Sequence, residues 1–197
     1  MISVRLPLQA DRDRLLAWRN RDAVRTVSLS QSLIEPEQHQ AWFSKLLLER
    51  EGQLGIVCND ERPVGVIQLD QLDLQTSEAT WGCHLGEIDV APGFGATLPI
   101  LGIALGLRGW GLKQLNAEVM AANKNMLGIH RRLAIRRIEP DPDPAKADEG
   151  PAIQAIQFQV SQDELPAILG RADRLFPRAL AASLASAVTA LESWRNH

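Results

Sequence analysis

The chain has 197 residues, of which 45% are hydrophobic and 23% charged, and its formal net charge is −3. This length and composition predict one domain with a sizeable core, and the negative charge argues against a whole-surface binder of nucleic acid or anionic membranes. No apolar run is long enough to span a membrane, and the N-terminus lacks a signal-peptide core. We therefore expect a cytoplasmic protein without nucleic-acid or membrane partners.

The first half of the chain predicts strands and amphipathic helices. A strand is expected over 4–8 and a helix over 9–20, with Leu15, Leu16 and Trp18 on its apolar face. A second helix, over 35–50, begins near Pro36, since proline is tolerated in the first helical turn. Two short apolar runs, 54–58 and 63–69, flank Asn59-Asp60-Glu61-Arg62 and predict a β-hairpin.

The second half continues with alternating strands and helices and ends in a helical segment. We expect strands over 78–85, 115–121, 135–138 and 153–160, and helices over 97–110 and 124–132. Residues 139–150 contain three prolines and predict a loop; from Asp163 the chain is predicted helical, with breaks near Gly170 and Pro177. The order indicates an α/β (α+β) domain over 1–160, a mixed sheet flanked by helices, and a C-terminal helical extension over 161–197.

A glycine-rich loop, Val90-Ala91-Pro92-Gly93-Phe94-Gly95-Ala96, separates the strand over 78–85 from the helix over 97–110. Glycines let the backbone turn sharply, and a helix N-terminus offers free amides and a positive dipole to an anion such as phosphate. The same pattern also fits an ordinary strand-to-helix turn. Cys58 and Cys83 lie far apart and match no metal-ligand spacing, so no metal site is expected.

The loop, its helix, the next strand and Asn123 with its short helix together resemble the GNAT acyl-CoA N-acetyltransferases. The resemblance implies that the glycine loop binds the pyrophosphate of acetyl-CoA and that Asn123 contacts its pantetheine arm or nearby backbone. The implied cofactor-binding residues are Val90, Gly93, Phe94, Gly95, Ala96 and Asn123.

Several positions depart from the family pattern. Val90 stands where glutamine or arginine is common, and Ala134-Ile135 replaces the closing Gly-Phe. Pro92 has no N–H group, so we expect Gly93, Gly95 and Ala96 to make the phosphate contacts. The tyrosine that commonly lies seven positions after the asparagine, near the cofactor thiol, is replaced by His130.

His130 has chemistry suited to this position, because histidine titrates near neutral pH and can give a proton to a leaving thiolate. The alternative is a solvent-facing helical histidine whose neighbours Arg131 and Arg132 lower its pKa. A basic segment supports a phosphate-bearing ligand, with seven cations and only one acid, Glu118, between residues 108 and 137. The cations are Arg108, Lys113, Lys124, Arg131, Arg132, Arg136 and Arg137.

Two N-terminal motifs resemble one branch of the family. They are Trp18-Arg19-Asn20 with Ala23-Val24-Arg25, and the run from Ile34 to Phe43 with Glu37, His39 and Trp42-Phe43. This branch is similar to the acetyltransferases of pseudaminic acid biosynthesis, which N-acetylate a UDP-linked amino sugar. The resemblance covers roughly residues 2–138.

The same residues are candidates for an acceptor site. Trp18 and Trp42 offer ring faces, Arg19 and Arg25 suit phosphate oxygens, and His39 suits a hydroxyl, with Asn20 beside them. Core packing by the tryptophans and a helix-tying role for Arg19 and Asn20 are the alternatives. For the catalytic base the candidates near the strand over 78–85 are Glu78, His84 and Glu87, with Glu118 on the neighbouring strand.

The sequence thus predicts transfer of an acetyl group from acetyl-CoA to a nucleotide-linked amino sugar by direct attack of the amine. Two alternatives stay open: a protein N-terminal acetyltransferase of the ribosomal-protein type, and a degenerate acyl-CoA-binding module without turnover. The helical segment from Asp163 has leucines at helical spacing and could pack on its own domain or on a second subunit, so a homodimer is also open.

Overall fold

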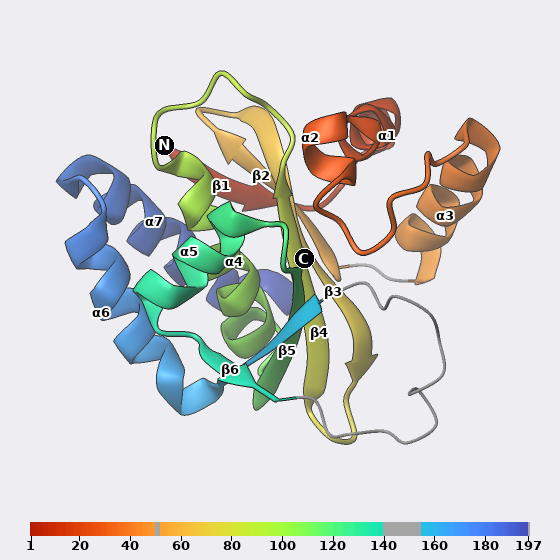
Figure 1. The fold of residues 1–197 in the computed structure, drawn as a ribbon. Coiled ribbons are helices and arrows are strands. Elements are labelled where there is room, and N and C mark those ends of the chain that lie inside the picture. The colour runs from red at the N-terminus through yellow and green to blue at the C-terminus, as the bar shows by residue number, and fades with distance from the viewer. Residues whose placement is uncertain (50–51, 140–154, 197) are drawn as a thin grey trace.

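The computed structural model describes residues 1–49, 52–139 and 155–196. It is a mixed α/β domain built on one seven-stranded sheet in the order β1-β2-β3-β4-β5-β7-β6, with helices on both faces (Figure 1). This is the fold class that the sequence predicts. No helix in these ranges is both long and apolar enough to cross a membrane.

The N-terminal half supplies four strands and the helices of one layer. They are β1 (Ile2–Arg5), α1 (Arg12–Asn20), α2 (Asp22–Arg25), α3 (Pro36–Glu49), β2 (Leu54–Asn59), β3 (Arg62–Asp73) and β4 (Glu78–Leu85). The predicted hairpin is confirmed: β2 and β3 pair antiparallel, and both turn residues, Asp60 and Glu61, have positive φ. That backbone matches the twist of the flanking strands.

The C-terminal half supplies the other layer. Its elements are α4 (Thr97–Ala104), β5 (Gln114–Met120), α5 (Lys124–Leu133), β6 (Arg136–Ile138), β7 (Ala155–Ser161), α6 (Leu165–Leu175) and α7 (Arg178–Ala190). Helices α4, α5, α6 and α7 lie on one side of the sheet and α1, α2 and α3 on the other (Figure 1). Each layer has its own apolar cluster, centred on α4 in one case and on Trp18 and Phe43 in the other.

The sheet opens between its two central strands. β4 and β5 are parallel and pair only from Glu78↔Gln114 to Thr80↔Asn116, whereas β4 continues to Leu85 and β5 to Met120. Beyond Thr80 each strand stays paired on its outer edge, β4 with β3 and β5 with β7. The facing edges therefore diverge, and their N–H and C=O groups have no ladder partners there.

The C-terminal helices belong to the main core. Leu165, Ile168, Leu184 and Trp194 are buried in the same cluster as α4 and the sheet. The amide of Ile2 in β1 donates to Ser183 Oγ in α7 at 2.6 Å. This segment therefore packs on its own domain.

Two sequence-based boundaries are wrong. The first strand is Ile2–Arg5 rather than residues 4–8, because the Leu8 amide donates to Asp11 Oδ2 at 2.8 Å and begins the helical turn. α6 runs through Gly170 without a break, since glycine costs a helix only about 1 kcal/mol and this helix buries an apolar face. The break at Pro177 is confirmed, and the predicted loop from residue 140 lies outside the described residues.

The segment that follows β4 is held in place by α1. Trp18 is buried, and its indole Nε1 donates to Glu87 Oε1 at 2.8 Å. The ring lies directly on the backbone of Gly86: a Cβ added there would be 2.0 Å from Trp18 Cδ2. Arg21 adds a hydrogen bond to the Gly86 carbonyl. Only glycine therefore fits at position 86.

Gly86→Ala should lower the free energy of unfolding by at least about 2 kcal/mol, because the methyl group overpacks a buried indole. Gly128→Ala is the matched control, since its Cβ meets no atom within 4 Å inside α5. That change should raise stability by about 0.5–1 kcal/mol through helix propensity. Urea unfolding of both variants measures the difference; equal effects would contradict the packing described for Trp18.

Candidate functional site

Two adjoining cavities lie beside the central strands of the sheet. The first, of about 260 Å³, lies between α1, α3 and the sheet. It is lined by Leu15, Arg19, Ile34, Gln38, His39, Trp42, Leu54, Val66, Gln68 and His84. The second, of about 250 Å³, lies where β4 and β5 diverge and reaches α5. Arg19, Gln68 and His84 line both, so the cavities meet at these three side chains.

Most of the buried polar atoms without a hydrogen-bond partner belong to residues that line the second cavity. Across the described residues, six buried side-chain nitrogen atoms lack a hydrogen-bond partner. Five belong to residues that line this cavity, namely Arg19 Nη1, Trp81 Nε1, His84 Nε2 and both ring nitrogens of His130. Buried polar groups are almost always satisfied, so this concentration indicates a site for a polar ligand or ordered water.

His84 stands on β4 at the junction of the cavities. Burial, together with the nearby charge of Arg19, lowers the pKa of His84 to about 4. The imidazole is therefore neutral at neutral pH, and its unpartnered Nε2 is able to accept a proton. The sequence named His84 as a candidate base without fixing its face; it lies on the face that carries α1 and α3.

His130 lies deep in α5, in a cage of aromatic rings. It is fully buried, with its ring centroid 5.5 Å from that of Trp81 and 4.4 Å from that of Phe158 in an edge-on contact. The idea of a solvent-facing histidine is thus wrong. The pKa of His130 is lowered to about 4, and the ring is therefore neutral at neutral pH. The lowered pKa was predicted, but its cause is burial rather than the charges of Arg131 and Arg132.

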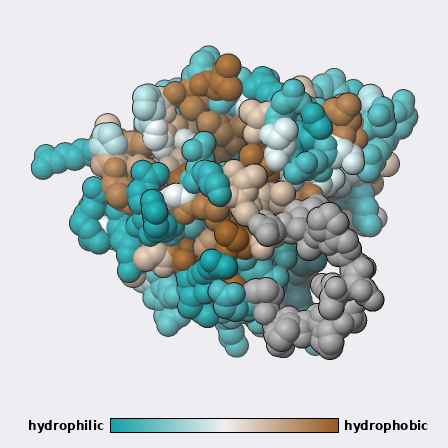
Figure 2. Space-filling model, viewed as in Figure 1, coloured by the Kyte–Doolittle hydropathy of each residue, from teal (hydrophilic) through white to brown (hydrophobic). Residues whose placement is uncertain are grey.

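The glycine loop turns into α4 as the sequence predicts, with Gly93 in the left-handed region at φ 87°. Phe94 is buried, and its amide donates to Ala91 O at 3.0 Å. The Ala96 amide donates to Gly93 O at 3.0 Å, so the expectation that Ala96 offers a free N–H is wrong. Gly93 and Gly95 keep amides that donate to no other described residue. Val90 packs against the core, and hydrophobic residues gather over this loop near the top of Figure 2.

Asn123 lines the second cavity and also caps α5, where its Oδ1 accepts from the Met126 amide at 3.1 Å. The helix ends at Ala134, which takes the left-handed conformation (φ 54°) that glycine prefers.

The basic segment is dispersed: Arg108 pairs with Glu192 and Arg137 with Glu139, and Arg136 bonds to Gln159. Lys124, Arg131 and Arg132 remain exposed on α5.

The Trp18-Arg19-Asn20 motif mainly positions loops. Trp18 is a core residue, and Asn20 is tied to Ile34 by two reciprocal 2.9 Å hydrogen bonds between its amide group and the Ile34 backbone. Arg19 Nη2 donates to Ser30 O at 2.8 Å, and Arg25 Nη1 to Gln31 O at 2.9 Å. These bonds hold the segment between α2 and α3. Trp18, Asn20 and Arg25 line neither cavity, in line with the alternatives of core packing and helix tying, whereas Arg19 lines both and keeps an unpartnered nitrogen, Nη1.

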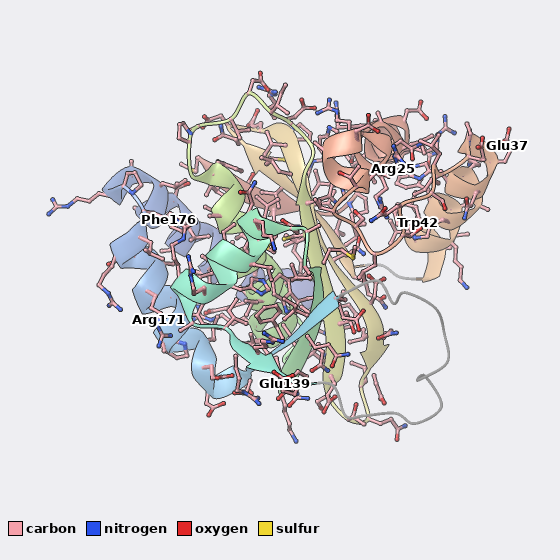
Figure 3. The ribbon with its side chains drawn as sticks, in the orientation of Figure 1. Arg25, Glu37, Trp42, Glu139, Arg171 and Phe176 are labelled. Atoms are coloured by element: carbon pink, nitrogen blue, oxygen red, sulfur yellow. The ribbon has the colours of Figure 1, made fainter. Side chains whose placement is uncertain are left out.

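His39 and Trp42 line the first cavity from α3. His39 is buried and bonds through Nε2 to Arg12 O at 2.7 Å, and its ring lies against Trp42 at 5.3 Å. His39 therefore joins α3 to α1, and the neighbouring Trp42 forms part of the cavity wall. Figure 3 shows Arg25 and Trp42 on the same side of the sheet.

The structure separates the candidate bases. Glu78 pairs with Gln114 at the closed end of the strands and lines neither cavity, and Glu87 is engaged by Trp18. Glu118 lines the second cavity and accepts from Gln157 at 3.3 Å. Gln68 is a cavity residue that was not predicted, because its place at the junction comes from its register with Gly82 on β4. No cluster of metal-ligating side chains occurs in the described part of the chain.

The chain is similar in structure to N-acetyltransferases. One solved structure, the apo form of FdhC, "a nucleotide-linked sugar GNAT", has a TM-score of 0.67 at 16% identity and covers 89% of this chain and 95% of that one. Mycobacterium smegmatis RimJ, solved with CoA-disulfide, has a TM-score of 0.68 at 14% identity, covering 88% of each chain. Campylobacter jejuni PseH has a TM-score of 0.56 at 16% identity, covering 82% and 98%.

No protein-family model and no curated protein sequence matches the chain. At these low identities the similarity establishes the fold, which is that of the GNAT N-acetyltransferases.

The buried His130 predicts an acid-sensitive fold. Its pKa is about 4 in the folded state and about 6.5 unfolded, so the unfolded chain binds more protons between these values. Its stabilising contribution is complete above pH 6.5 and declines as the pH falls toward 4. From pH 7 to 5, wild type should lose about 2 kcal/mol more than His130→Phe, measured by urea unfolding. Equal losses would mean that His130 is not buried neutral.

Proposed function

We propose that the chain is an acetyl-CoA-dependent N-acetyltransferase whose reaction takes place between the diverging strands β4 and β5. The observation that carries this proposal is the cluster of unpartnered nitrogens from Arg19, Trp81, His84 and His130 at that opening. These groups come from three separate elements, α1, β4 and α5, and buried polar groups in an ordinary core are almost always satisfied.

The opening has the features that an acetyl-CoA molecule requires. The unpaired edges of β4 and β5 offer N–H and C=O groups to the amides of a pantetheine arm, as a sheet edge does to an added strand. The amides of Gly93 and Gly95 at the start of α4 suit a pyrophosphate, and Lys124 and Arg131 add positive charge on α5. When bound, acetyl-CoA supplies an acetyl thioester open to attack by an amine.

His84 is suited to be the general base. Its imidazole is neutral above pH 5 and stands where the two cavities meet, so it can take a proton from an amine held in the first cavity. Holding amine and thioester together at this point contributes several kcal/mol to catalysis.

His130 is suited to stabilise the leaving sulfur. Because it is neutral at working pH, it acts by donating an N–H hydrogen bond to the developing thiolate, and its pKa would rise as that negative charge forms. This role replaces that of the tyrosine expected at this position.

A thiol also lines the second cavity, and its protonation state decides whether it could carry the acetyl group as an intermediate. Cys83 lines this cavity, and burial raises its pKa to about 12. The thiol is therefore protonated at neutral pH and unsuited to carry an acetyl group, since the thiolate is the nucleophile. This favours direct attack by the amine.

For the acceptor we propose a nucleotide-linked amino sugar, of the type acetylated in pseudaminic acid biosynthesis. The similarity to FdhC, described as a nucleotide-linked sugar GNAT, supports it, and so does charge: among the described residues that line the first cavity, Arg19 is the only one with a permanent charge. The similarity to a ribosomal-protein-alanine N-acetyltransferase argues instead for a protein N-terminus as the acceptor. Such an acceptor would place a positively charged amine near the positively charged Arg19.

A thiol-release assay tests the proposal. With acetyl-CoA, the protein should release free coenzyme A in the presence of a UDP-linked amino sugar but not of a peptide beginning with alanine. Gly95→Asp is the control, because a carboxylate among the loop amides repels pyrophosphate and should weaken acetyl-CoA binding. Binding of acetyl-CoA without release for any amine would overturn the enzyme assignment in favour of a binding module.

His84→Gln should lower kcat about 10²- to 10⁴-fold and leave the KM for acetyl-CoA unchanged, since the glutamine keeps polarity but takes no proton. The measurement is the steady-state rate with saturating acetyl-CoA. Glu78→Gln is the matched control at the closed end of β4 and should be silent. A full rate in His84→Gln would exclude His84 as the base.

A further inference from the structure

Arg19 brings an uncompensated charge to the junction of the two cavities. Nη2 of its guanidinium is bound to the Ser30 carbonyl at 2.8 Å, whereas the buried Nη1 lacks a partner in the described structure. Among the described residues, no carboxylate lines the first cavity, and the second has only that of Glu118, which accepts from Gln157. A buried cationic donor without an acceptor is costly, so the position favours a ligand that supplies one.

We propose that Arg19 Nη1 binds an oxyanion of the acceptor, a phosphate or carboxylate oxygen, and thereby selects anionic amines as substrates. The inference rests on the proposed acetyl transfer and deepens it by naming the charge that the acceptor carries. A guanidinium is the side chain best suited to such oxygens, because it is always charged and presents planar donors.

The surroundings of Arg19 define the rest of the acceptor. The first cavity is lined mainly by apolar side chains, among them Leu15, Ile34 and Trp42, so it suits an apolar body such as a deoxy-sugar ring or an aliphatic side chain. Arg19 and His84 line both cavities at their junction, so an oxyanion bound to Arg19 lies near the candidate base. The amine and the oxyanion must therefore lie on neighbouring parts of one molecule.

Arg25 provides a matched control. Like Arg19 it holds the segment between α2 and α3 through a backbone carbonyl, that of Gln31 at 2.9 Å, but it lines neither cavity. Arg25→Gln thus reports any loosening of the segment, and Arg19→Gln reports that effect together with the loss of the cation. Arg19→Lys keeps a positive charge without the planar fork.

The test is calorimetric binding of UDP, a phosphate probe, and of L-leucine, a carboxylate probe, each compared with the counterpart that lacks the anionic group, uridine or leucinamide. At least one anionic probe should bind wild type, with binding weakened roughly 10- to 100-fold by Arg19→Gln, less by Arg19→Lys and not by Arg25→Gln. The counterparts without the anionic group should not bind Arg19→Gln more weakly than wild type. Loss with UDP identifies a phosphate, and loss with L-leucine a carboxylate.

The proposal is overturned if neither anionic probe binds wild type, or if Arg19→Gln with an unchanged melting temperature binds both as wild type does. These outcomes are separable from failure of the acetyl-transfer proposal, because binding of the probes needs no acetyl-CoA. Thiol release with an amine that has no anionic group, unaffected by Arg19→Gln, would keep the enzyme and reject the anion site.

Discussion

The parallel pairing of β4 with β5 ends after three residue pairs, and the candidate site depends on that interruption. A continuous ladder would satisfy the backbone groups at the centre of the sheet and fill the space between the layers. Because the strands diverge, Arg19 and His84 from one layer and His130 from the other share a single opening. The antiparallel pairs on the outer edges, β3 with β4 and β5 with β7, keep the separated strands extended and hold the opening apart.

The helix that carries Trp18, Arg19 and Asn20 organises the loops on both sides of that opening. Trp18 fixes the backbone after β4, from which the glycine loop begins, and Asn20 fixes the start of α3, which carries His39 and Trp42. Of these three residues, only Arg19 has one nitrogen bound to a loop carbonyl and another without a partner at the cavity. A motif that resembles a ligand-binding signature is thus mostly a scaffold, and one of its side chains reaches the proposed acceptor.

Local patterns predicted most of the fold, since strand alternation and helix caps lie within a few residues, as for β4 and for α5 behind Asn123. They failed at Gly170, where burial of Leu165, Ile168 and Ala172 outweighs a single glycine. For the site, the family resemblance pointed to His130 and the position beside the glycine loop pointed to His84, but neither fixed the surroundings of the side chain. The spacing of Trp18 fits a ligand-binding face and a core position equally well, and the structure buries it. Gln68 has no local signature, because only strand register brings it to the junction.

The hydrogen bond from the Ile2 amide to Ser183 Oγ joins the first strand to the last long helix across 181 positions of sequence. Farther along, the indoles of Trp110 and Trp194 both donate to the Gly52 carbonyl, at 3.0 and 2.7 Å, beside the turn between α3 and β2. During synthesis on the ribosome, the sheet can form its hairpins early, but β1 lacks its covering helix until Ser183 has emerged. Contacts of such long range slow folding and leave apolar strand surface uncovered until the last helices have been made.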